Sequence, residues 1–206
     1  MKKFFILFAI LIGAGMFQAD AQNSQVVVIN EVAWAGTLAS PNDEWIELFN
    51  NSDRPVNLAG WVLQWEGRNI HFAEVAADVD TNTREIRNTV IPARGYYLLE
   101  RTDDTTVNNV EADLIYTGSL RNSGEKLELL DNRGVLIDTA NSDAEDGWIA
   151  GNSANGNVPY ASMERITART ADQINNWASN NGSERRGIDA NGGSINGTPK
   201  FRNSAR

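Results

Sequence analysis

The stretch that decides the fold opens with Ile29-Asn30-Glu31-Val32, continues as Asp43-Glu44-Trp45-Ile46-Glu47-Leu48-Phe49-Asn50 and closes with Leu58-Ala59-Gly60-Trp61-Val62-Leu63. Each piece is a short run of aliphatic, β-branched and aromatic residues. Residues 38–42 separate the first two runs, and residues 50–55, Asn-Asn-Ser-Asp-Arg-Pro, separate the second from the third. Runs bounded in this way are typical of strands joined by turns. The stretch therefore predicts the start of a small β-sandwich.

The rest of the chain continues this pattern. Residues 26–34 are apolar on both faces, which indicates an internal strand. Residues 125–130 and 135–138 flank Asp131-Asn132-Arg133-Gly134, a sequence typical of a hairpin turn. Residues 67–89 show a weak pattern and are interpreted as an insertion. Many short strands without a long amphipathic helix predict an all-β sandwich.

The order of these pieces resembles the lamin tail domain in its bacterial, secreted form. The resemblance covers residues 26–140 and includes Ile91-Pro92-Ala93-Arg94-Gly95-Tyr96-Tyr97-Leu98-Leu99 and Gly124-Glu125-Lys126-Leu127-Glu128-Leu129-Leu130-Asp131. It implies an immunoglobulin-like β-sandwich that serves as a binding or scaffolding module, and it implies no catalytic residues. We therefore assign residues 22–140 to this domain.

Residues 141–206 form a Gly-, Asn- and Ser-rich extension, which we expect to be irregular and packed on the sandwich. Ser162-Met163-Glu164-Arg165 and Gly197-Thr198-Pro199 resemble the extension of bacterial members, whereas Lys200-Phe201-Arg202-Asn203 replaces their usual Gly-Ala-Pro-Asn. Residues 171–177 predict one or two helical turns capped by Thr170. The end, from Gly192 on, is expected to be loose.

The N-terminus predicts a secretory signal peptide over residues 1–21. Lys2 and Lys3 precede an apolar run from Phe4 to Phe17, and Ala19-Asp20-Ala21 matches the small-x-small cleavage pattern. The run is shorter than the roughly 20 residues that span a bilayer. We expect cleavage after Ala21, no transmembrane segment in the mature chain, and a secreted, periplasmic or cell-surface location.

Charge and composition exclude several classes of function. Removing residues 1–21 leaves 185 residues with 16 basic and 26 acidic side chains, a net charge of −10. An acidic surface disfavours generic nucleic-acid binding, which depends on Lys and Arg. The chain has no cysteine, so disulfides, thiolate nucleophiles and thiolate metal sites are excluded.

No catalytic motif stands out, and we expect a protein that is not an enzyme and needs no cofactor. His71 is the only histidine, and its neighbours Ile70 and Phe72 indicate an ordinary strand position. Residues 151–155 approach a nucleophile elbow around Ser153 but lack its closing glycine. The alternative is a hydrolase with an unrecognised site.

Two ligand-binding alternatives remain open. Asp78, Asp80 and Asn82 have the alternate spacing of a calcium loop, but Thr83 and Thr89 replace its glycine and its bidentate glutamate. Trp65, at a strand end beside Glu66, is the best exposed candidate for stacking on a sugar. Calcium or carbohydrate binding is therefore the alternative to a secreted interaction module with an unidentified protein or cell-surface partner.

One structural ion pair is predicted. Glu31 lies among apolar residues, where an unpaired carboxylate is costly. Arg165 lies beside Met163 and Ile166 in the extension, and its planar guanidinium can satisfy both carboxylate oxygens. We expect the pair Glu31–Arg165 to clamp the extension onto the sandwich.

Overall fold

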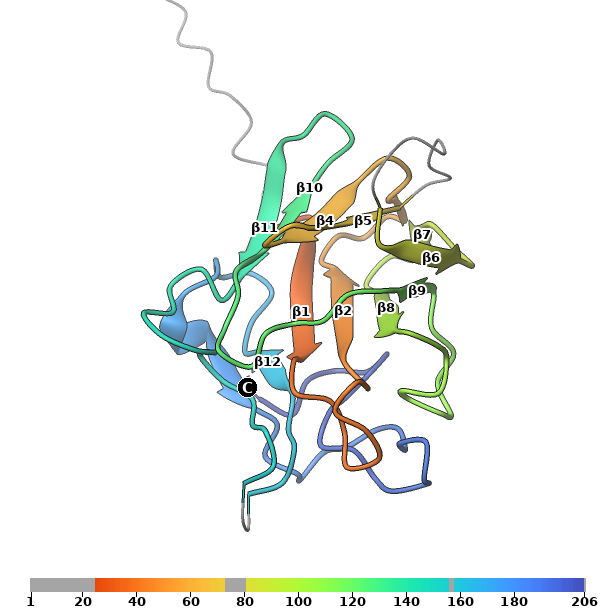
Figure 1. Ribbon diagram of the computed structural model, residues 1–206. Helices are drawn as coiled ribbons and strands as arrows, with labels where there is room; N and C mark the ends of the chain where they lie inside the picture. The colour runs from red at the N-terminus through yellow and green to blue at the C-terminus, as the bar shows by residue number, and fades with distance from the viewer. Residues whose placement is uncertain (1–24, 73–80, 156–157, 206) are drawn as a thin grey trace, which may run out of the picture.

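The computed structural model describes residues 25–72, 81–155 and 158–205. Strands dominate this part of the chain, and the only helix in it is one short 3-10 turn (Figure 1). The elements are β1 (Val27–Ala33), β2 (Trp45–Asn50), β3 (Val56–Asn57), β4 (Val62–Trp65), β5 (Arg68–His71), β6 (Thr83–Ile86), β7 (Val90–Ile91), β8 (Tyr96–Arg101), β9 (Leu114–Tyr116), β10 (Leu127–Leu130), β11 (Leu136–Ala140), β12 (Met163–Arg165), η1 (Ile174–Asn176) and β13 (Trp177–Ser179).

Two main sheets enclose the core. The larger has the strand order β13-β12-β1-β2-β8-β9-β6, and the smaller has the order β11-β10-β4-β5; β3 and β7 form a separate pair. In Figure 1, β4 and β5 cross β1 and β2 at a steep angle. All pairings are antiparallel except that of β8 with β9. The all-β sandwich expected from the sequence is confirmed.

Strand β1 is internal, as its apolar character indicates. It pairs with β12 on one side and β2 on the other, and all seven of its residues are buried. Ile29 and Val32 face the other sheet within the main core, whereas Ala33 faces outward and packs with Trp45 and Ile195. The larger sheet is therefore covered on both faces, and the outer cover comes partly from the C-terminal extension.

The smaller sheet contains the expected hairpin. Strands β10 and β11 pair across the turn at residues 131–135, where Asp131 accepts backbone hydrogen bonds from Arg133 and Val135. Gly134 has a φ of +76°, a conformation that glycine adopts without steric cost. The side chains of Leu127 and Leu129 lie in the core.

The stretch from residue 56 to residue 89 differs from the sequence interpretation. The expected strand up to Trp65 is divided into β3 and β4 by a turn at residues 58–61, closed by a hydrogen bond from the Trp61 amide to the Leu58 carbonyl. The expected insertion contains β5 and β6. Ile70 is the one buried residue of these two strands, and the others are exposed or partly exposed, so the strands contain few apolar residues and their pattern is weak.

The extension is more regular than expected. Strands β12 and β13 add two strands to the larger sheet. The predicted helical turn is only η1, whose N-cap is Gln173 rather than Thr170, with no side-chain capping bond. The prediction of a loose end is wrong for the described residues, because the end of the extension runs beside β1, β2 and β12 (Figure 1), and Thr198 is fully buried there.

Candidate functional site

A row of three glutamates crosses the outer face of the larger sheet. Glu31 on β1 is the register partner of Glu164 on β12 and of Glu47 on β2. Register partners in antiparallel strands project on the same face, so the three side chains are neighbours. Each has 0% exposure. Buried carboxylates need hydrogen-bond donors or a proton, and the segment lying over this face supplies the donors.

A β-bulge in β1 directs polar groups to this face. The register with β2 shifts between Ile29 and Glu31, so Asn30 is the extra residue. Ile29 and Val32 both face the core, and the bulge therefore places Asn30 and Glu31 together on the outer side. The Asn30 side chain donates to Glu47 Oε1 at 2.8 Å.

The C-terminal segment, residues 196–205, covers the central glutamate. Glu31 Oε1 accepts hydrogen bonds from Ser162 Oγ at 2.6 Å and from the Thr198 amide at 2.8 Å. Thr198 Oγ1 lies 2.9 Å from Glu31 Oε2. Gly197 allows this close approach, since a Cβ there would lie 2.7 Å from Trp45 and 3.1 Å from Glu31.

The two outer glutamates also bind the C-terminal segment, and Glu164 in addition binds Asn180, which precedes this segment. Glu164 accepts hydrogen bonds from Asn180 Nδ2 at 2.7 Å, Ser204 Oγ at 2.6 Å and the Ala205 amide at 2.9 Å. Glu47 Oε2 accepts a bond from the Lys200 amide. The final turn also forms despite its unusual sequence, with Asn203 Nδ2 donating to the Asn30 and Arg165 carbonyls.

The arrangement requires a proton within the row. Thr198 Oγ1 lies 2.9 Å from Glu31 and 3.0 Å from Glu164, but a hydroxyl has one proton to donate. One carboxyl group must therefore donate to it. Burial and the nearby Glu164 raise the pKa of Glu31 to about 8, against the opposing hydrogen bonds from Ser162 and Thr198. The raised pKa of Glu31 favours this group as the carrier of the proton in its contact with Thr198.

The predicted pair Glu31–Arg165 is wrong. In the strand pairing Glu31 lies opposite Glu164, so the next residue, Arg165, projects on the inner face. There its guanidinium bonds Asp138 at 2.6 Å and stacks 4.5 Å above the Trp177 ring. It also donates to the carbonyls of Ile29, Thr139 and Thr170. Arg165 does connect the extension to the sandwich, but through Asp138 on β11.

Trp65 does not provide a platform for sugar stacking. Its side chain is 3% exposed and packs edge-on against Tyr116, with ring centroids 5.8 Å apart. Its indole nitrogen donates to the Ser119 carbonyl at 3.2 Å. The tryptophan therefore belongs to the core, and the prediction of an exposed stacking surface at Trp65 is wrong.

The other candidate residues do not converge. His71 lies half-buried on β5 in the smaller sheet, and Ser153 is exposed in a loop of the extension. Asp78 and Asp80 lie outside the described residues, so the calcium loop stays a prediction. Asn82 is described, and its side chain accepts a hydrogen bond from the Asn69 amide at 3.3 Å.

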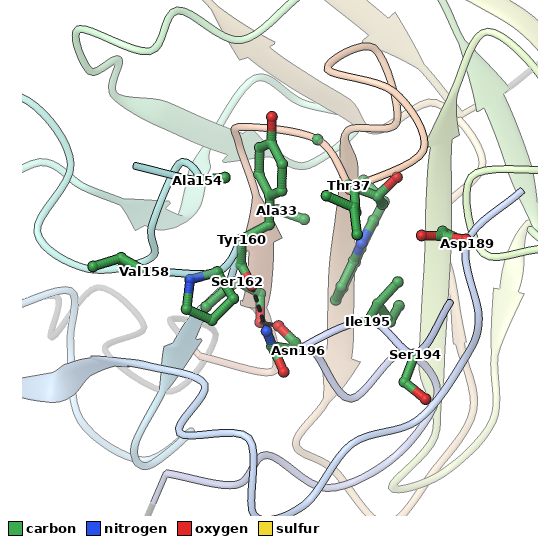
Figure 2. A pocket seen from close by; sticks show the side chains of 15 residues that line it. Ala33, Thr37, Ala154, Val158, Tyr160, Ser162, Asp189, Ser194, Ile195 and Asn196 are labelled. Atoms are coloured by element: carbon green, nitrogen blue, oxygen red, sulfur yellow. Dashed lines mark hydrogen bonds between the residues drawn. The ribbon is translucent and has the colours of Figure 1, made fainter. Parts of the chain in front are cut away.

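A cavity of about 290 Å³ opens beside the glutamate row (Figure 2). Ser162, which donates to Glu31, lies in its wall. The remaining lining comes from the end of β1 and the following loop, from β2, from Ala154, from residues 158–161 and from the loop 189–196. The apolar lining residues are Ala33, Leu38, Trp45, Ala154, Val158, Pro159, Tyr160, Ala161 and Ile195, and the others are Gly36, Thr37, Ser162, Asp189, Ser194 and Asn196.

Sequence reasoning did not identify this cavity, because its walls come from segments that are far apart in the chain. A local signal exists for one wall. Asp189-Ala190-Asn191-Gly192-Gly193 is typical of a turn in which the aspartate binds following amides. Asp189 Oδ1 does accept bonds from the Asn191 and Gly193 amides, at 2.9 and 2.8 Å.

Over residues 25–72, 81–155 and 158–205, no helix has the length and apolar character needed to cross a bilayer. In the same ranges, no three His, Cys, Asp or Glu side chains are grouped so that they could hold a metal ion.

Comparison with known proteins agrees with the β-sandwich fold. The family model described as Lamin Tail Domain matches residues 20–143, more than half of the chain. The matched region includes β1 to β11 and ends before β12, so two of the strands in the larger sheet lie beyond it. The search of curated proteins returned no match.

Proposed function

The chain belongs to the lamin tail domain family, and from this premise we propose that it is a secreted, non-catalytic interaction or scaffolding module for a protein or cell-surface partner. The family has an immunoglobulin-like fold, which serves as a framework for binding. Fold alone does not specify function, so the proposal also depends on what the polar groups of this chain do.

The observation that carries the proposal is that the buried carboxylates bind groups of the chain itself. Glu31, Glu47 and Glu164 accept hydrogen bonds from the chain's own C-terminal segment. Asp138 is bound by Arg165 and by the Ile29 amide. These acids stabilise the fold. Glu31 accepts a bond from the Ser162 hydroxyl, but the only histidine of the sequence, His71, lies on β5 of the smaller sheet, so this pair lacks the histidine that a Ser-His-Asp triad requires.

We predict that the purified protein lacks hydrolase activity. The measurement is a panel of nuclease, esterase, protease and glycosidase substrates, assayed with the protein and with a matched mock purification. Both should give the same background rate. Turnover that co-purifies with the protein and is abolished by replacing a single carboxylate would contradict the non-enzymatic assignment.

The secreted location is supported by residues 1–21 alone. We predict that the exported protein begins at Gln22, because the cleavage pattern ends at Ala21. N-terminal sequencing of protein recovered outside the cytoplasm tests this. Replacing Ala19 and Ala21 by bulky residues should leave the precursor uncleaved, whereas a mature protein that still begins at Met1 would refute the prediction.

A further inference from the structure

We propose that the cavity beside the glutamate row binds a cationic segment of a partner polypeptide, in which a Lys or Arg is adjacent to an aliphatic or aromatic side chain. This inference rests on the proposed function as an interaction module, and it specifies the chemistry of the partner. Three features of the cavity support it: its apolar floor and rim, its free polar atoms, and its charge.

The cavity has the size and lining for one large apolar side chain. Its volume of about 290 Å³ is at the lower limit for ligand sites, which range from about 300 to 1,000 Å³. Trp45, Tyr160 and Ile195 contribute apolar surface to its lining. At its rim Leu38 is 82% exposed and Val158 is 46% exposed. Apolar residues exposed around a cavity are typical of interaction sites.

The polar atoms that remain unpaired in the cavity include two hydrogen-bond acceptors. Asn196 donates its Nδ2 to the Tyr160 carbonyl at 2.6 Å, the dashed line in Figure 2, and no described residue donates a hydrogen bond to its Oδ1. Asp189 is 3% exposed, and its Oδ1 is bound by two loop amides. Within the described residues its Oδ2 has no hydrogen-bond donor. Figure 2 shows this carboxylate turned towards Thr37.

Thr37 does not supply a donor to this site. Its hydroxyl donates to Asp43 Oδ2 at 2.6 Å and accepts from the Ala39 and Ser40 amides. A ligand that satisfies Asp189 Oδ2 and Asn196 Oδ1 must therefore provide donors. Ammonium and guanidinium groups are donors without acceptors, and charge-assisted bonds to a carboxylate are the stronger kind.

The charge near the cavity favours a cation. Burial raises the pKa of Asp43, and the nearby charges of Asp103 and Asp189 act in the same direction. No Lys or Arg is among the described residues that line the cavity. Among residues 25–72, 81–155 and 158–205, no cation forms an ion pair with these three aspartates. The chain as a whole has a net charge of −9.

The test is binding of capped, fluorescent octapeptides to the protein without its predicted signal peptide, followed by fluorescence anisotropy. One set combines Lys and Arg with Leu, Phe or Trp. A second set replaces the basic residues by Glu, and a third replaces the apolar residues by Ser. Only the first set should bind, and its affinity should fall as salt is raised, because exposed charge attraction is screened. Equal binding of all sets, or of none, overturns the proposal.

Two variants locate the binding at the cavity. Asp189→Asn keeps Oδ1 for the loop amides and replaces Oδ2 by a donor, so affinity should fall by about tenfold or more. Leu38→Arg should have a similar effect. Its matched control is Leu136→Arg, because Leu136 is 49% exposed on β11 and is absent from the cavity lining. Unchanged binding by both cavity variants, or equal loss in the control, would refute the site.

The outcomes also separate this inference from the proposed function. If the peptides do not bind but a pull-down recovers a partner whose binding survives Leu38→Arg, the cavity proposal fails and the interaction module stands. If the hydrolase panel reveals turnover, the non-catalytic proposal fails regardless of the result of the peptide-binding measurement. Circular dichroism melts of each variant show whether a loss of binding reflects a loss of folding.

Discussion

Replacing Arg165 by methionine is expected to lower the free energy of unfolding by about 3 to 5 kcal/mol at pH 7 to 8, the cost of breaking one side of a buried ion pair. The Arg165 side chain has 0% exposure, and Asp138 has 4%. Burial raises the pKa of Asp138 to about 6, against the opposing attraction of Arg165. The carboxylate is therefore charged at this pH, and methionine leaves that charge without a cation.

A double-mutant cycle identifies the partner. Asp138→Asn keeps an acceptor for the Ile29 amide and removes the charge, so the double variant with Arg165→Met should be less destabilised than the sum of the single variants. Glu31→Gln combined with Arg165→Met should be additive within about 0.5 kcal/mol, as for independent sites. Urea midpoints provide the data. Coupling of Arg165 with Glu31 and not with Asp138 would contradict the assignment of partners.

The sequence predicted the need for a partner but not which residue it is. Local composition shows that Glu31 lies among apolar residues, and burial of a carboxylate requires compensation wherever it occurs. The partner depends on strand register and on chain order in three dimensions. Thr198 is 167 residues away from Glu31 in the sequence. Glu31 pairs with Glu164, and Arg165 is the next residue of β12, so its side chain lies on the opposite face of the sheet from Glu31.

Alternation along single strands is the more reliable guide. In β2, Ile46 and Leu48 lie in the main core, and Trp45, on the opposite face, lies in the outer cluster. The same rule puts Trp65 on the face of Leu63, inside the core. The stacking prediction for Trp65 was wrong because a position near a strand end suggested exposure, whereas the segment around Ser119 covers the indole.

The sequence predicts a loose end from Gly192 on, because the last residues of a domain are poorly ordered unless they pack on it. Polar residues of this segment cannot build a core, but their amides and hydroxyls are hydrogen-bond donors. Ser204 donates in this way to Glu164, and the Thr198 amide donates to Glu31. Order in this segment therefore comes from buried hydrogen-bond acceptors on the sheet. The segment's own sequence has no periodic pattern from which this order could be predicted. The cavity has the same origin, because its walls are brought together by this packing.

Raising the pH from 5 to 9 is expected to destabilise the protein, because a glutamate of the row is protonated in the folded state and loses this proton at high pH. The pKa of Glu31 is raised from 4.5 to about 8 in the folded state, and burial and the neighbouring Glu31 raise that of Glu47 well above 4.5. A raised folded-state pKa means that the folded form binds more protons. The stabilisation is complete below pH 4.5 and is lost as the pH rises through about 8.

The size of this loss and its control follow from the same linkage. The shift of Glu31 corresponds to about 3 to 5 kcal/mol at roughly 1.4 kcal/mol per pKa unit, and Glu100, whose pKa burial raises to about 8, acts in the same direction.

Glu31→Gln imitates the protonated acid, so the unfolding free energy of this variant should decline less with pH and exceed that of the wild type at pH 9. Glu111→Gln is the matched control, because the Glu111 side chain is 77% exposed. Urea unfolding at pH 5, 7 and 9 measures each profile, and a wild-type stability that stays level or rises over this range would show that the row is ionised throughout. Loss of amide protection at Thr198 and Lys200 at high pH would locate the effect, since both amides bind the row directly.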